Sequence, residues 1–328
     1  SAEALGANPR FKDNYVTYLA SGQVYGKPVS ITEWNVPFPE VDRFTAPLYV
    51  ASISALQGWD APMIYNYSQR TFGKPSRQGT WSTFSDVAIT GMMPASALLY
   101  RQGHVSDAAK SYCIMLDRES LYFKSSHPRN MATLRTLIEQ SKVTVGLPET
   151  KELDWDQQTK VRAETTVITD TDRDFIPAGH NFVRSDTGEL TRNWLRGYQI
   201  IDTDKTQAAH GWIGGESLGL KQTSFEIATP KAAVAVSSLD GEAIGRSRKV
   251  LISAVARAVP SEGDRMPMLS EPVEGRIRIA GPPGLRLIPM AGDASGLGAL
   301  DVEYTDGKYL VELPAQSGTH WFMLDAED

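Results

Sequence analysis

The sequence is poor in the residues that form cross-links and metal sites. Cys113 is the only cysteine among 328 residues, which excludes a disulfide within the chain and a cysteine-based metal site. The 5 histidines are scattered without the spacing of zinc ligands. The acidic stretch DTDRD at 170–174 lacks the glycine and the distal glutamate of a calcium loop, so we interpret it as a solvated turn, with a structural Ca²⁺ as the alternative. We therefore predict no metal and no cofactor.

The sequence also lacks runs of one kind of residue. The formal net charge is -6 and no cluster of lysine and arginine stands out, which argues against a nucleic-acid-binding face. No apolar stretch reaches the ~18 residues that a membrane helix needs. We therefore predict no nucleic-acid partner and no membrane partner. A hydrophobic content of 41% and a charged content of 22% are those of an ordinary globular protein.

The first third of the chain alternates between helical and strand-like patterns. Apolar residues at helical spacing predict helices, and runs of strand-forming residues predict strands. The order of helix and strand implies parallel strands joined by crossover helices. The predicted helices are 8–25, 43–58 and 94–102, and the predicted strands are 29–33 and 61–69.

The pattern changes after about residue 110. From residue 158 onward, short runs of alternating apolar and polar residues are separated by turn-forming residues, which is typical of an antiparallel sandwich or barrel. The stretch TDG at 305–307 is a good hairpin turn. We therefore expect an α/β portion followed by an all-β portion, with residues 1–110 as a first domain, 111–155 as a helical connection and 156–328 as a β-sandwich.

Polar and aromatic side chains follow both strands of the first portion. In parallel α/β folds, functional residues lie at the carboxyl ends of the strands. Aromatic faces, amides and a carboxylate together suit a sugar ring, although each aromatic residue could equally belong to the core and Glu33 could be an ordinary loop carboxylate. A loop at 73–86 adds one more aromatic candidate. The candidate residues are Glu33, Trp34, Asn35, Tyr65, Asn66, Tyr67, Gln69 and Trp81.

Short motifs give a resemblance to a known family. TEWN at 32–35, YNYSQ at 65–69 and PASALLYRQGHV at 94–105 resemble strands seven and eight and the closing helix of retaining (β/α)8-barrel glycoside hydrolases. The segment 246–324, from RSRKVLISAVARA through HWFML, resembles a β-sandwich that often follows such barrels. The resemblance implies that Glu33 is the catalytic nucleophile, that the other candidates bind the sugar, and that the substrate is a β-linked polysaccharide such as β-1,4-glucan or xylan. It also implies export from a bacterial cell, into the periplasm or the medium.

The sequence departs from this family in two ways. It contains no Asn-Glu pair to supply the acid/base, and about 110 residues stand where a barrel takes roughly 250. The resemblance therefore implies the C-terminal portion of an enzyme, whose exposed strand edges would be covered by an N-terminal barrel fragment or a second copy of the chain.

Two other functions remain open. One is a non-catalytic carbohydrate-binding or structural β-sandwich. The other is an esterase, since GESLG at 215–219 matches the G-x-S-x-G nucleophile elbow, with Ser217 at its centre and Asp301 and His320 in the expected order. The stretch that follows GESLG alternates like a strand, whereas the elbow requires a helix there, so we interpret it as a sandwich turn.

Overall fold

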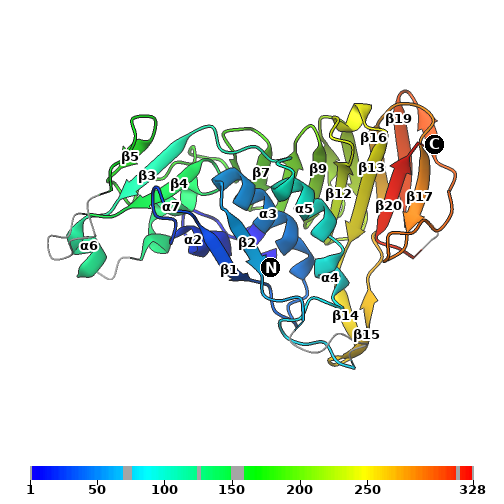
Figure 1. Cartoon of the computed structure of the whole chain (residues 1–328), viewed down its shortest axis with the longest axis horizontal. Coiled ribbons are helices and arrows are strands. Elements are labelled where there is room, and N and C mark those ends of the chain that lie inside the picture. Colours follow the sequence, from blue (N-terminus) through cyan, green and yellow to red (C-terminus); the bar gives the residue numbers. More distant parts are fainter. Residues whose placement is uncertain (1, 69–75, 124–126, 149–158, 315–317, 327–328) are drawn as a thin grey trace.

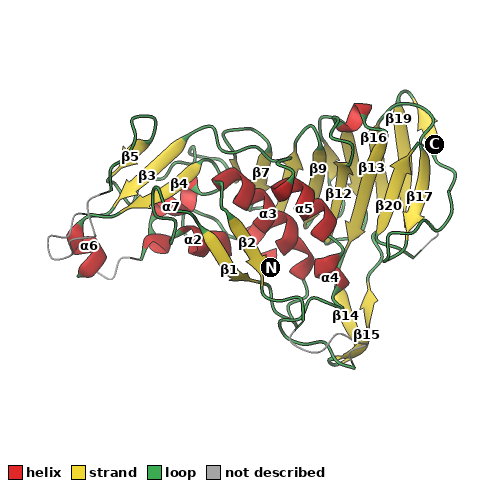
Figure 2. Cartoon of the chain, in the orientation of Figure 1, coloured by secondary structure: helices red, strands yellow, loops and turns green. Residues whose placement is uncertain are grey.

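The computed structural model describes residues 2–68, 76–123, 127–148, 159–314 and 318–326. Of these residues, 34% lie in strands and 18% in helices. Helices cover one face of a long antiparallel sheet, and a smaller antiparallel sheet packs on its other face (Figures 1 and 2). None of the helices in the described ranges is long and apolar enough to cross a membrane.

The central layer is an antiparallel sheet of 8 strands. Its strands run along most of the second half of the chain, and each neighbouring pair is antiparallel. In spatial order they are β17 (Arg286–Met290), β20 (Trp321–Asp325), β13 (Lys249–Val255), β12 (Ala232–Ser238), β9 (Thr206–Gly211), β8 (Tyr198–Asp202), β7 (Leu190–Asn193) and β6 (Phe182–Arg184).

The second sheet has 5 antiparallel strands. Its last two strands are joined by the predicted hairpin turn: Asp306 and Gly307 both have positive φ, 53° and 76°, as a two-residue turn of this kind requires. The prediction of a turn at 305–307 is confirmed. In spatial order the strands are β10 (Ser217–Gly219), β11 (Thr223–Ile227), β16 (Gly275–Ala280), β19 (Lys308–Leu313) and β18 (Glu303–Thr305).

Strand β12 shows how the central sheet serves two cores. Successive side chains of a strand point to opposite faces. Ala233 and Ala235 belong to the core shared with the helices, whereas Val234 and Val236 belong to the core shared with the five-stranded sheet. The small alanine side chains let helices approach one face closely. Both faces are covered, which explains why every residue of β12 is buried.

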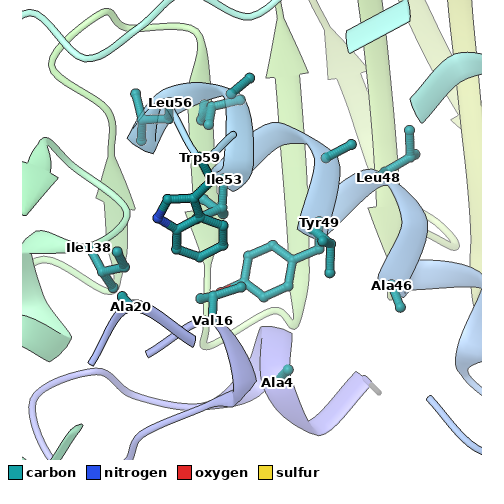
Figure 3. Close-up of a cluster of buried hydrophobic side chains, with 14 of the residues drawn as sticks. Ala4, Val16, Ala20, Ala46, Leu48, Tyr49, Ile53, Leu56, Trp59 and Ile138 are labelled. Carbon is teal, nitrogen blue, oxygen red and sulfur yellow. The ribbon is translucent and has the colours of Figure 1, made fainter. Parts of the chain in front are cut away.

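The helical layer is built around α3 (Ala46–Gln57), whose residues are all buried. A helix that is apolar on all sides has to be buried on all sides. Tyr49, Ile53, Leu56 and neighbouring Trp59 form the middle of this core (Figure 3). Gly58 ends the helix with a φ of 65°, as the sequence predicts.

The other helices are shorter. Helix α5 (Met93–Arg101) packs beside α3, and both lie on the eight-stranded sheet. The remaining helices are α1 (Ala2–Gly6), α2 (Tyr15–Ala20), α4 (Val87–Thr90), α6 (Arg118–Tyr122) and α7 (Ala132–Leu137), with 3-10 turns η1 (Arg43–Thr45), η2 (Pro128–Asn130) and η3 (Ile244–Arg246).

In the described ranges, parallel pairing forms two small sheets beside the helices, with one further parallel bridge between Val24 and Val145 (Figure 1). In one, β1 (Ser30–Trp34) pairs with β2 (Ala61–Ile64). In the other, β3 (Ser111–Met115) lies between β4 (Lys142–Gly146) and β5 (Thr166–Ile168). A separate antiparallel hairpin consists of β14 (Ala258–Glu262) and β15 (Arg265–Ser270).

The predicted barrel portion is wrong. Among the described residues, the sheet of β1 and β2 contains these two strands alone, and strands and helices do not alternate around a barrel. Helices α3 and α5 pack on the antiparallel sheet, where alanines of β9 and β12 make room for them. The fold is therefore mostly β, and the resemblance to (β/α)8-barrel glycosidases is not supported. The proposed partner fragment or second copy at the strand edges stays a prediction.

The predicted helix at 8–25 is also too long. Asn14 caps a helix that runs only from Tyr15 to Ala20, and its side chain accepts a hydrogen bond from Thr17 N at 3.2 Å. Upstream, Lys12 N bonds Asn8 O at 2.8 Å in a separate turn. An asparagine side chain satisfies the free N–H groups at a helix start, so the chain begins a new helix at Asn14.

Candidate functional site

The carboxyl ends of β1 and β2 are joined by one asparagine. The Asn35 Nδ2 group donates to Tyr65 O at 2.7 Å and to Trp81 O at 2.9 Å. Its Oδ1 atom accepts from Val36 N at 2.8 Å. Both hydrogens of the amide are therefore used within the protein, and Asn35 positions its neighbours.

The loop that carries Trp81 is held on two sides. On one side, Asn66 N donates to Trp81 O at 3.0 Å, and Thr83 N donates to Asn66 O at 3.1 Å. On the other side, Gln78 N donates to Asp264 O of the β14–β15 hairpin at 2.7 Å. These bonds fix the described part of the loop, 76–86, against the ends of β1 and β2.

A buried ion pair anchors the end of this loop. Arg43 Nε lies 2.6 Å from Asp86 Oδ2, and both side chains are almost fully buried. The other carboxylate oxygen of Asp86 accepts from Ala88 N and caps α4. Arg43 also donates to Ala258 O of β14 at 3.2 Å. The loop is therefore connected to the core of the protein as well as to its surface.

Four aromatic side chains gather at this edge, and we call them the aromatic surface: Tyr65, Tyr67, Trp81 and Phe84. Tyr65 and Trp81 have ring centroids 6.4 Å apart, and Tyr67 and Phe84 have centroids 5.4 Å apart. The residues expose 37%, 52%, 39% and 36% of their surface, respectively. Large aromatic residues that stay exposed together on a rigid frame mark a binding surface more often than isolated ones do.

Glu33 lies on β1 beside the aromatic surface, directly before Trp34. Its side chain is exposed, and within the described ranges it forms no hydrogen bond or ion pair. The acids in the connection after β1 and at the end of the loop 76–86 are already engaged: Asp42 pairs with Lys231 at 3.0 Å, and Asp86 pairs with Arg43. Glu40 Oε1 accepts from Asp42 N at 3.3 Å. The carboxylate of Glu33 is thus available to a ligand, and these three acids are not placed as its partners.

Two buried polar atoms close to the aromatic surface have no protein partner in the described part of the chain. They are Trp34 Nε1, a donor, and Asn66 Oδ1, an acceptor. Buried polar atoms are nearly always hydrogen-bonded, because leaving them without a partner costs free energy. Both atoms are closed off from the surface, so they mark an unsatisfied spot under the aromatic surface and do not contact a ligand in this conformation.

The structure brings most of the candidate residues to one edge of the molecule. Asn35, Tyr65, Asn66 and Trp81 meet there through the bonds described above. Trp34 and Tyr67 join them, since Tyr65 N donates to Trp34 O and Phe84 N donates to Tyr67 O, each at 2.9 Å. Glu33 lies on the same strand end. Gln69 lies outside the described residues. Phe84 was missed by the sequence reasoning, although it follows Trp81 by three positions in a loop already singled out. Trp34 is only 9% exposed and belongs to the core beneath the site.

The other motifs do not form sites in the described residues. Ser217 opens β10 and pairs with Glu226 of β11, so no helix follows it as a nucleophile elbow requires. His320 bonds Ala254 in the other sheet. In the acidic stretch 170–174, Asp174 pairs with Arg10 at 2.6 Å. No group of three or more metal-ligating side chains occurs in the part of the chain that the structure describes.

Comparison with known proteins adds no relative. The chain matches no protein-family model, no curated protein and no solved structure.

Proposed function

We propose that this protein binds a polysaccharide or oligosaccharide without cleaving it. The observation that carries the proposal is the aromatic surface of Tyr65, Tyr67, Trp81 and Phe84 beside the exposed carboxylate of Glu33. A sugar ring presents an apolar face of C–H groups and a rim of hydroxyl groups. Aromatic rings suit the face, and polar groups suit the rim.

The rigidity of the surface supports binding. Asn35, Thr83 and the pair of Arg43 and Asp86 hold the strand ends and the loop in one geometry. A surface that is already ordered loses little conformational entropy when it binds.

The number of available carboxylates favours binding over hydrolysis. Glycoside hydrolysis by the common route needs two carboxyl groups, about 5 to 10 Å apart according to the stereochemistry. Glu33 is exposed and unengaged in the described ranges, whereas Glu40, Asp42 and Asp86 are held by other groups. Glu33 therefore serves as an acceptor for sugar hydroxyls in this proposal. Export from a bacterial cell stays a prediction, since none of the observations above bears on it.

The test is a depletion assay with insoluble β-1,4-glucan and xylan. The wild-type protein is expected to leave the supernatant, and Trp81→Ala and Tyr67→Ala are expected to stay in it. Loss of one stacking ring should weaken binding about tenfold or more, corresponding to ~1.4 kcal/mol. The matched control is Trp212→Ala, which removes another exposed tryptophan, 51% exposed and placed at the end of β9.

The same samples decide between binding and hydrolysis. We expect no release of reducing sugar from either polysaccharide. Release that disappears in Glu33→Gln while binding persists would establish a hydrolase with Glu33 as a catalytic group. Equal depletion of wild type and both aromatic variants would show that the aromatic surface is not the site.

A further inference from the structure

A concave site separate from the aromatic surface lies at the opposite ends of the parallel strands. A cavity of about 340 Å³ opens where the chain enters β1, β2, β3 and β4, away from the aromatic surface at their carboxyl ends. Its volume is within the usual range for pockets that bind small molecules. It is lined by Tyr25, Lys27, Ser111, Lys142, Arg162 and Glu164, among others.

The charges around this cavity are unbalanced. Lys27, Lys142 and Arg162 carry three positive charges, and none of their side chains forms an ion pair with a described residue. Two acids also line it. The Asp60 carboxylate accepts from Val29 N at 2.7 Å and keeps its charge, and Glu164 has no hydrogen-bond partner in the described ranges, so the three cations exceed the two acids by one positive charge.

The hydroxyl groups of the cavity add donors. Tyr25 accepts a bond from Arg162 N at 3.1 Å through its oxygen, so its own hydrogen is available. Ser111 Oγ accepts from Thr165 Oγ1 at 3.3 Å, so the hydrogen of the Ser111 hydroxyl is available too. No acceptor for either hydrogen occurs among the described residues. The side chains that converge on this cavity are therefore mainly donors, which is the arrangement that recognises anionic oxygens.

A purely structural role for Lys142 is the alternative. Its Nζ atom lies 3.0 Å from the position that a Cβ atom on Gly58 would take, at the carboxyl end of α3. A positive charge there complements the helix dipole. This role accounts for Lys142 alone. It does not account for Lys27, Arg162 and the two hydroxyl groups that face the same cavity.

We propose that this cavity binds a small molecule of monosaccharide size that carries a carboxylate or phosphate group. The anionic oxygens would accept hydrogen bonds from Lys142, Arg162 and the hydroxyls of Tyr25 and Ser111, with Lys27 at the rim. The proposal does not depend on the carbohydrate-binding function of the aromatic surface, because the two sites lie at opposite ends of the strands and share no residue.

The test is calorimetric titration of the full chain with glucuronate, glucose 6-phosphate and neutral glucose. At least one of the two anions is expected to bind, and glucose is not; the comparison of the anions tells a carboxylate from a phosphate ligand. Lys142→Gln and Arg162→Gln should each weaken that binding by about tenfold, the usual effect of removing one charged hydrogen bond. Lys308→Gln is the matched control, since it removes one exposed lysine from the distant strand β19.

Three results would overturn the proposal. These are equal binding of glucose and both anions, no binding of either anion, and an affinity that neither cavity variant changes. Arg162 does not contact Gly58 at the end of α3. The Arg162→Gln variant therefore still tests the proposal if Lys142→Gln fails to fold. Binding measured with Tyr67→Ala should equal that of wild type, which separates this cavity from the aromatic surface.

Discussion

At the scale of the residue, His210 shows what burial does to a titrating group. It lies on β9 with no exposed surface, and its Nε2 atom is 2.8 Å from Gln199 Oε1. Gln199 Oε1 can only accept, so Nε2 carries the hydrogen of the neutral ring. Nδ1 has no described partner, and protonating it would create a buried donor without an acceptor. Burial lowers the pKa of His210 to about 3 from its ordinary value of 6.5.

This pKa predicts a loss of stability in mild acid. The folded pKa lies below the unfolded one. The contribution of neutral His210 to the free energy of unfolding is therefore fully present above pH 6.5 and is lost as the pH drops from 6.5 toward 3. At pH 5.5 the loss from this group is about 1.4 kcal/mol. Urea unfolding at pH 7.5 and 5.5 measures it, and the drop should be smaller by this amount in His210→Gln. The control is His180→Gln, which removes an exposed histidine. Equal drops in all three proteins would contradict the assignment.

At the scale of the element, the ends of β1 and β2 and the loop 76–86 behave as one unit because Asn35 joins them. Removing its amide leaves Tyr65 O with one hydrogen bond fewer and weakens the hold on Trp81. Asn35→Ala should lower the free energy of unfolding by about 1–3 kcal/mol and weaken polysaccharide binding, although Asn35 has no free donor for a ligand. Chemical denaturation and the depletion assay measure the two effects.

Two further variants sharpen this test. Asn35→Asp keeps the size and the acceptor of the side chain but removes both donors, so it should be at least as destabilising as Asn35→Ala. Asn181→Ala removes an exposed asparagine whose side chain has no hydrogen bond to a described residue, and it should change neither property. Wild-type stability in Asn35→Asp would show that the amide does not hold the loop.

Local signals explain which elements the sequence predicts. Gly58 ends α3 and the TDG turn joins β18 to β19 because each depends on a left-handed backbone that glycine favours. The aromatic residues after β1 and β2 were also recognisable, since strand ends are read directly from the chain. The ion pair of Arg43 with Asp86 could not be recognised in the sequence, because the two residues are 43 positions apart and neither lies in a distinctive local sequence.

At the scale of the whole molecule, the central sheet belongs to two cores at once. Ala233 and Ala235 of β12 face the helices, whereas Ala232, Val234 and Val236 face the five-stranded sheet. The run AAVAV is therefore apolar on both faces and shows no apolar–polar alternation in the sequence. Short motifs near the start of the chain favoured a barrel instead. Two strands cannot specify the closure of a barrel, and several of the strands whose pairing decides the fold are far apart in the sequence.

Shared cores predict that the chain unfolds as one unit. Arg192 of β7 adds to this coupling: it pairs with Glu139 at 2.6 Å and donates to Leu5 O and Ala7 O at 2.8 Å, all within the core. Differential scanning calorimetry should show one transition, although the sequence suggests separate domains at 1–110 and 156–328. Arg192→Met leaves Glu139 buried without its partner and should destabilise the whole transition by about 3–5 kcal/mol.

The control for this prediction is a surface pair. Arg276 lies 3.3 Å from Glu312 with both side chains largely exposed, and Arg276→Met should cost less than about 1 kcal/mol. Two resolved transitions in the wild-type protein, or an Arg192→Met variant that shifts only one of them, would show that the helices and the sheets fold independently.

The most direct test of the carbohydrate-binding function is affinity electrophoresis in native gels that contain soluble β-glucan or xylan. We expect wild type and Trp212→Ala to be retarded by at least one of the two polysaccharides, and Trp81→Ala to migrate as it does in a gel without polysaccharide. Equal migration of wild type in gels with and without polysaccharide would contradict it.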